Sequence, residues 1–148
     1  MYHDEEVIVL NSEFTIAVHS LVFLAYTPQR MASSQVIAEN VSTNPARIRK
    51  VMICLRNKGF VTTKEGIGGG YLLEEDPNEI TLGQVYRSVS CGTIKPNWCS
   101  GNPEEECVIS SNIQVVMDDI FEEADSYVAA YLDKVTIASV LEKIKQCR

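Results

Sequence analysis

Four glycines within five positions, in the stretch KEGIGGGYLLEE (residues 64–75), most limit how this chain can fold. Short β-prone segments flank them, FVTTKE before and YLLEE after. A P-loop requires Gly-Lys-Ser/Thr and then a helix, and a dinucleotide fingerprint also requires a helix after its glycines. Here a strand follows, so the pattern predicts a β-hairpin whose tip uses glycine for positive φ and close backbone approach.

Two helices joined by a tight turn are predicted before this hairpin. Ser33 or Ser34 caps the first helix, and the turn STNP supplies a capping residue and a proline for the first turn of the second. Gly59 ends the second helix. Its core face is formed by apolar residues at helical spacing: Ile48, Val51, Met52 and Leu55. A helix-turn-helix followed by a hairpin predicts a winged helix, whose second helix enters the major groove of DNA.

The charge distribution supports a nucleic-acid partner although the net charge is −7. Residues 40–64 contain six Lys or Arg and no acid, whereas residues 71–148 carry six basic against fourteen acidic residues. A local basic surface can bind phosphate while an acidic remainder discourages indiscriminate association.

Candidate DNA contacts follow from the position of each residue in this winged helix. Residues at the start of the second helix are expected to face base edges: Asn44, Pro45, Ala46, Arg49 and Lys50. A second set is expected to position phosphates: Ser33, Ser34, Gln35, Arg47 and Lys64. Backbone groups at the hairpin tip are expected to assist them: Gly66, Gly68, Gly69 and Gly70.

An apolar helix is predicted ahead of this motif, capped by Asn11 or Ser12 and stopped by Pro28. It is apolar on most faces, which indicates a central core helix, and His19 within it is expected to be half-buried and hydrogen-bonded. No run of about 18 apolar residues occurs and the N-terminus is acidic, so we expect a cytoplasmic protein.

After the glycine hairpin, the sequence predicts a helix capped by Thr81, a loop, a long helix over about 110–134 and a short helix capped by Thr136. The long helix has too few partners in its own chain, which predicts dimerisation through the stripe Ile113, Val116, Ile120, Ala124, Tyr127 and Tyr131. The expected fold is mainly α with a small β-wing: a winged helix-turn-helix (1–90), a cysteine-bearing regulatory loop (91–109), and the dimerisation helix with the short helix (110–148).

Five cysteines are present. Cys54 is expected to be inert packing, and the candidate redox or regulatory thiols are Cys91, Cys99, Cys107 and Cys147. Nearby basic residues favour the thiolates of Cys91 and Cys99, whereas the preceding EEE is expected to raise the pKa of Cys107, opposed by the start of the long helix. Thiol oxidation, an iron–sulfur cluster, and unmodified thiols with small-molecule control all remain open; zinc is disfavoured by the spacing.

The motifs together resemble the Rrf2 family of bacterial transcription regulators, from about Asn11 to the end. The segment LRNKGFV, then G-x-G-G-G-Y-L-L and ITLGQV, carries the resemblance. It implies a dimeric repressor regulated through the loop before the long helix. Many members hold an iron–sulfur cluster there on closely spaced cysteines. The NPARIRK turn and the NIQVV start of the long helix indicate the branch without that motif. The wider spacing here, Cys91-x7-Cys99-x7-Cys107, disfavours a cluster, and no cofactor or metal site is expected. An arginine common before the first wing glycine is replaced by Glu65.

Two other classes of protein are weaker interpretations. An enzyme such as a thiol oxidoreductase lacks C-x-x-C and a nucleophile–base pair. A winged-helix protein–protein adaptor would present an apolar or acidic recognition face, which the basic stretch 40–64 does not provide.

Overall fold

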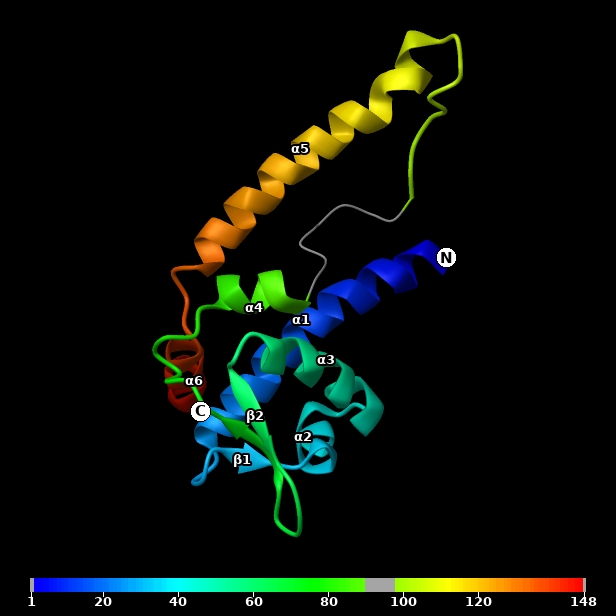
Figure 1. Cartoon of the computed structure of the whole chain (residues 1–148). Helices are drawn as coiled ribbons and strands as arrows, with labels where there is room; N and C mark the ends of the chain where they lie inside the picture. The colour runs from blue at the N-terminus through cyan, green and yellow to red at the C-terminus, as the bar shows by residue number, and fades with distance from the viewer. Residues whose placement is uncertain (1, 90–97, 148) are drawn as a thin grey trace.

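The computed structural model describes residues 2–89 and 98–147, with side chains from Ser12 onward. Its elements are α1 (Tyr2–Tyr26), β1 (Met31–Ala32), α2 (Ser34–Val41), α3 (Pro45–Asn57), β2 (Val61–Lys64), β3 (Gly70–Leu73), α4 (Leu82–Val89), α5 (Val108–Leu132) and α6 (Ile137–Gln146). Figure 1 shows a compact body from which α5 projects. The predicted fold class is confirmed: a mainly helical winged helix-turn-helix with a long C-terminal helix.

The first helix forms the centre of the body. It packs against α2, α3, α4 and α6, and buries Ala17, Leu21 and Leu24 completely. The prediction that it starts at Asn11 or Ser12 is wrong, because the helix already begins at Tyr2. No glycine or proline interrupts residues 2–11, so this segment of the sequence contains no residue that breaks a helix. No helix in the described ranges is long and apolar enough to cross a membrane.

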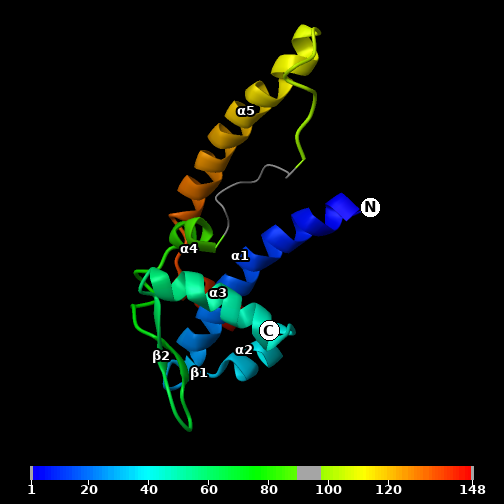
Figure 2. The same cartoon turned by 45° about the vertical axis from the view of Figure 1, so that its right-hand side comes forward.

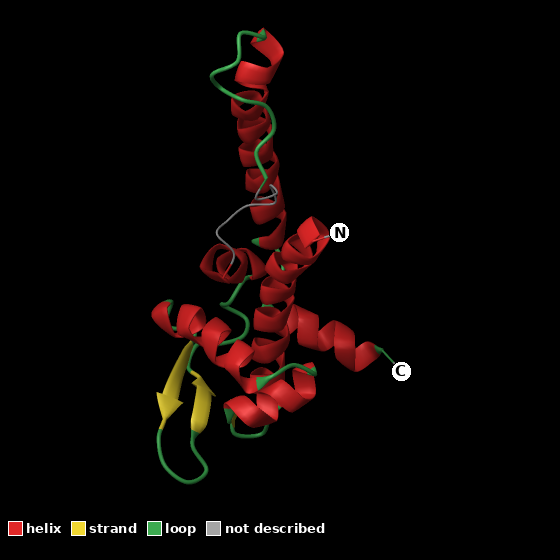
Figure 3. Ribbon diagram, turned by 90° about the vertical axis from the view of Figure 1, so that its right-hand side faces the viewer, coloured by secondary structure: helices red, strands yellow, loops and turns green. Residues whose placement is uncertain are grey.

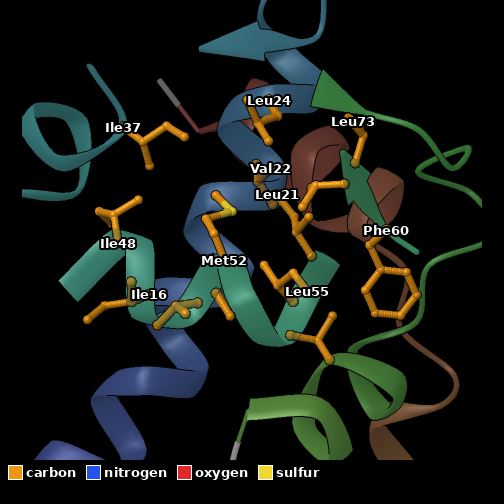
Figure 4. Packing of buried hydrophobic residues seen from close by; sticks show 14 of the residues in the cluster. Ile16, Leu21, Val22, Leu24, Ile37, Ile48, Met52, Leu55, Phe60 and Leu73 are labelled. Carbon is orange, nitrogen blue, oxygen red and sulfur yellow. The ribbon is translucent and has the colours of Figure 1, made fainter. Parts of the chain in front are cut away.

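The second and third helices form the predicted helix-turn-helix. Ser33 caps α2 by accepting a hydrogen bond from the N–H of Val36, and Ser42 ends the helix in the left-handed conformation. The predicted core face of α3 is fully confirmed, since Ile48, Val51, Met52 and Leu55 are all buried. Figure 4 shows Met52 and Leu55 of α3 near Leu21 and Val22 of α1, and Ile48 near Ile37 of α2. The core therefore fixes α3 against α1.

The wing contains three antiparallel strands in the order β1-β3-β2, where the sequence predicted two. β2 pairs with β3 from Val61↔Leu73 to Lys64↔Gly70, and β1 pairs with the other edge of β3. Gly70 has a φ of +148°, and a Cβ there would collide with the Ala32 carbonyl. Glycine at this position therefore permits the close approach of β1 that the two-strand prediction overlooked.

The fifth helix extends away from the body, and its main neighbour is α4 (Figures 1 and 3). Tyr86 of α4 donates a hydrogen bond to Asp125, which together with burial raises the pKa of Tyr86. Arg87 forms a bidentate pair with Asp133, at 2.8 and 2.7 Å, just after α5. The helix begins at Val108 and ends at Leu132, close to the expected 110–134.

The last helix returns to the body. Thr136 caps it through a capping box with Ser139, as predicted, and Ile137 is completely buried. The helix packs against α1 (Figure 3). Two elements that the sequence placed with the dimerisation region thus lie on different parts of the molecule: α5 outside the body and α6 within it.

Candidate nucleic-acid interface

The start of α3 is the first component of the candidate interface. Asn44 is its N-cap residue, and its Oδ1 accepts a hydrogen bond from the N–H of Arg47 at 2.9 Å. Pro45 follows at the first helical position, where a missing N–H has no cost. Both features were predicted from the turn STNP. They orient the first turn of α3 outward from the body.

Replacing Asn44 with alanine is expected to lower the free energy of unfolding by about 1 kcal/mol, because Arg47 loses the acceptor of its N–H. Urea denaturation followed by circular dichroism measures this. Asn57→Ala is the matched control, since Asn57 is exposed at the other end of α3. An equal loss in both variants would show that the cap contributes nothing.

The exposed face of α3 lies opposite its buried residues. Ala46, Arg49, Ile53 and Arg56 recur at spacings of three and four and are all exposed. The face therefore combines two guanidinium groups with small and apolar side chains. Ile53 and Arg56 were not among the predicted contacts; their spacing from Arg49 is the sequence signal that identifies them.

Two of the predicted basic contacts turn toward α1 instead of standing free. The Lys50 Nζ lies 3.2 Å from Glu13 Oε1, and the lysine side chain remains 73% exposed. Arg47 is only partly exposed, and its Nη2 atom is buried without a hydrogen-bond partner among the described residues. Lys50 was predicted to face base edges and Arg47 to face a phosphate. In the fold, both side chains lie on the side of α3 that is next to α1.

The helix α2 packs against α3 and leads directly into the turn before the start of α3 (Figure 2). Gln35 is exposed, whereas Ser33 and Ser34 are half-buried, and the Ser33 hydroxyl is already used as the cap. What this helix end offers a phosphate is therefore its first N–H groups, which have no partner inside the helix, together with the Gln35 side chain.

The wing tip carries one feature that the sequence analysis missed. Lys64 is exposed, as predicted, and Gly66 and Gly68 have φ of +95° and +78°. The N–H of Gly69 donates to the Gly66 carbonyl at 3.1 Å and closes the turn. Ile67 is completely exposed at the tip. The sequence contained a signal for this exposed residue, because a single apolar residue between turn glycines at a hairpin tip has no neighbours that could bury it.

Comparison with known proteins decides which family this architecture represents. The model of the family described as "Rrf2: Iron-dependent Transcriptional regulator" matches residues 10–143. The chain belongs to the Rrf2 family. Its predicted resemblance is thereby confirmed, and so is the absence of an enzymatic role, because this is a family of transcription regulators.

Individual relatives agree with this assignment. YwnA of Bacillus subtilis, described as an HTH-type transcriptional regulator, is 31% identical over 114 residues, covering 77% of this chain and 83% of YwnA. The HTH-type transcriptional regulator NsrR of the same organism is 34% identical over 91 residues, covering 56% of this chain and 62% of NsrR. A crystal structure of a transcriptional regulator from Lactobacillus plantarum matches with a TM-score of 0.74 at 26% identity, covering 91% of each chain.

The α5 helix of this Rrf2 protein presents an apolar stripe to solvent. Ile113 and Ala124 are half-buried, whereas Val116, Ile120, Tyr127 and Tyr131 are between 52% and 72% exposed. The face toward α4 is a different one, occupied by Asp125 and the buried Ala129. Four of the six predicted dimer residues are therefore left largely uncovered by their own chain.

The cysteines do not form one cluster in the described part of the chain. Cys54 is half-buried against the core, as predicted, whereas Cys99, Cys107 and Cys147 are exposed. Cys91 lies outside the described residues. Cys107 is the N-cap residue of α5; its side chain forms no cap hydrogen bond, yet the nearby N–H groups of Ser110 and Ile109 lower the pKa of its thiol. Of the two opposed effects expected for this thiol, the lowered pKa agrees with the start of α5 and not with the rise expected from EEE.

The family description names iron. No group of three His, Cys, Asp or Glu side chains within residues 12–89 and 98–147 is arranged to hold a metal ion. The described side chains therefore do not fit an iron–sulfur cluster.

Proposed function

We propose that the protein is a dimeric, sequence-specific DNA-binding repressor of the cytoplasm, in a branch of the Rrf2 family without the standard cluster cysteines. The observation that carries the DNA-binding part is the exposed, basic face of α3. Arg49, Lys50, Arg56, Lys58 and Lys64 are all exposed, and no acid occurs between residues 40 and 64. The repressor role rests on the resemblance to the family.

In the proposed complex α3 lies in the major groove. Arg49 reads a guanine edge with its two guanidinium N–H groups, and Asn44, Pro45 and Ala46 approach neighbouring bases. Lys50 joins them by leaving its pair with Glu13, and because the Glu13 side chain is only 15% exposed, DNA contacts must offset the cost of breaking this pair. Arg56 extends the same exposed face.

Phosphate contacts flank the recognition helix. The start of α2, with Ser33, Ser34 and Gln35, approaches one strand, and Lys64 with the backbone of Gly66 to Gly70 approaches the backbone near the wing. Arg47 was predicted to join this set, but the fold turns its guanidinium toward α1. Ile67 at the tip suits the minor groove, where apolar side chains insert between base steps.

The partner proposed for the α5 stripe is a second copy of this chain. The stripe supports this because it is long, apolar and separate from the face that packs on α4. Regulators of the helix-turn-helix class bind two half-sites as dimers, so a twofold arrangement of α5 also explains how one protein reads an extended operator.

Regulation is proposed to occur through thiol oxidation. Hydrogen peroxide would oxidise two thiols to a disulfide: one thiolate attacks the peroxide, the second displaces the oxygen from the sulfenic acid, and with the two thiol protons the peroxide leaves as two molecules of water. Cys107 is the first candidate because it is exposed and its pKa is lowered at the start of α5; its partner would be Cys91, Cys99 or Cys147. An iron–sulfur cluster is the alternative regulator, and the anaerobic absorption spectrum with an iron assay separates the two.

The lowered pKa of Cys107 predicts that it is alkylated at lower pH than an unperturbed thiol. More thiolate exists below its ordinary pKa in the folded state, so the pH of half-maximal iodoacetamide labelling is expected to fall below that of the same cysteine in urea. Mass spectrometry of the labelled peptide measures both profiles. Coincident profiles in folded and unfolded protein would contradict the role of the helix start.

Affinity for duplex DNA as a function of salt tests the proposed function. A steep fall of log K with log salt is expected, because basic contacts release counterions on binding. A winged-helix adaptor for protein partners would show weak DNA binding or none. That result would refute the proposal.

A further inference from the structure

A pocket of about 460 Å³ lies between α1 and the turn that joins α2 to α3. Its polar lining comes from Ser12, Thr15 and His19 of α1, Ser42 and Thr43 of the turn, and Arg47 of α3. Figure 2 shows these elements side by side at the start of the recognition helix. No acidic side chain lines the pocket in the described part of the chain.

Arg47 is the charged group of this pocket, and its bonding is incomplete. The Nη2 atom is buried and has no hydrogen-bond partner among the described residues. Its backbone position is fixed, because its N–H donates to Asn44 Oδ1. The carboxylate that α1 brings to this side of α3, that of Glu13, pairs with Lys50 instead. A buried, unpaired guanidinium N–H is costly, and Arg47 lines the pocket, so a shift of its side chain that brings Nη2 to an acceptor there would stabilise it.

We infer that this pocket binds a small oxyanion, a free phosphate or a carboxylate, through the guanidinium of Arg47. A guanidinium donates two parallel N–H groups to such a group, and the charge of the anion strengthens both hydrogen bonds. Ser42 and Thr43 also line the pocket, and their hydroxyls suit the remaining anion oxygens. His19 is held in place by Asn40, whose Oδ1 lies 2.8 Å from Nε2.

The location gives the anion a consequence for α3. An oxyanion bound to Arg47 would join α1 to the first turn of the helix that carries Ala46 and Arg49. Only this effect on α3 rests on the proposed DNA-binding function. The binding of the oxyanion to Arg47 does not. The test therefore begins with protein free of DNA.

Thermal melting of the full chain in sodium phosphate, titrated against sodium chloride at constant ionic strength, tests the site. A saturable rise in Tm of about 3–6 °C is expected at ten times Kd. Arg47→Met is expected to lose the rise. Arg49→Met, which removes a guanidinium from the exposed face of α3, is expected to keep it. An equal rise in wild type and Arg47→Met, or a rise no larger than in chloride, would overturn the inference.

The test requires that the Arg47 variant folds without phosphate. Without phosphate, Arg47→Met is expected to melt no lower than the wild type, because it removes a buried donor that lacks a partner. If this variant unfolds, Arg47→Lys is used in its place. A lysine keeps the positive charge but lacks the planar guanidinium that donates two parallel hydrogen bonds. Its phosphate affinity, measured by calorimetry, is therefore expected to fall at least about tenfold. Unchanged affinity in Arg47→Lys would also overturn the inference.

The oxyanion could instead belong to the DNA backbone, and salt dependence distinguishes the two sources. If Arg47 binds a free anion, Arg47→Met in chloride buffer leaves the slope of log K against log salt for duplex DNA unchanged. A slope reduced by about one unit is the result expected for a lost phosphate contact. Such a reduced slope would mean that Arg47 binds a DNA phosphate, and it would overturn the inference of a free anion. This conclusion does not depend on whether the other tests of the proposed function succeed.

Discussion

Replacing Arg49 with alanine is expected to weaken binding to the operator by about 1–3 kcal/mol, which is about 5- to 150-fold. Arg49 is exposed on the face of α3 opposite its buried residues, one turn after the N-cap. A bidentate contact to guanine has no substitute once the guanidinium is removed. Fluorescence anisotropy with labelled operator and with random duplex of equal length measures the specific and non-specific components separately.

Lys64→Ala is the matched control for this variant. Lys64 is exposed on the wing and is proposed to contact a phosphate, so its loss should weaken binding to both duplexes alike and lower the salt slope by about one. Equal losses on operator and random duplex for Arg49→Ala would show that Arg49 positions the protein and does not read sequence.

Replacing Ile120 with aspartate is expected to produce a monomer that binds the operator about 100- to 10,000-fold more weakly. Ile120 lies in the middle of the apolar stripe of α5 and is 52% exposed in its own chain. In a dimer the carboxylate would be buried in an apolar contact without a partner, which is costly. Loss of the second half-site removes the gain in effective concentration that linking two binding units provides.

Analytical ultracentrifugation and operator titration of the same samples measure this effect. Ser126→Asp is the control, because it adds the same charge to an exposed position on a different face of α5. The control should remain dimeric and bind normally. An Ile120→Asp protein that stays dimeric would place the interface elsewhere.

Local signals made most of the winged helix-turn-helix predictable. Asn44 and Thr81 act as caps, and α3 buries its apolar face, because each depends on residues within one or two helical turns. The third strand could not be predicted in this way. β1 has only two residues and pairs with β3 about forty positions later, so neither its length nor its composition shows a strand pattern.

The candidate site was predicted less completely than the fold, for a physical reason. Sequence position places Arg47 and Lys50 at the start of α3, but only the packing of α1 shows that Glu13 and a pocket engage them. The pKa of Cys107 differs, because the amides that lower it belong to the adjacent first turn of α5, an effect that the sequence already indicated. The contacts of Arg47 and Lys50 arise between elements, where local sequence patterns carry little information.

Selection of duplexes from a randomised DNA pool by the purified protein tests the central claim most directly. The claim is that two copies of α3, related by twofold symmetry, each read a half-site through the face that carries Arg49. Sequencing of the bound fraction is therefore expected to recover an inverted repeat with two equivalent half-sites, about one helical turn or a multiple of it apart. A bound fraction with no enriched sequence, or with a single half-site alone, would contradict the account.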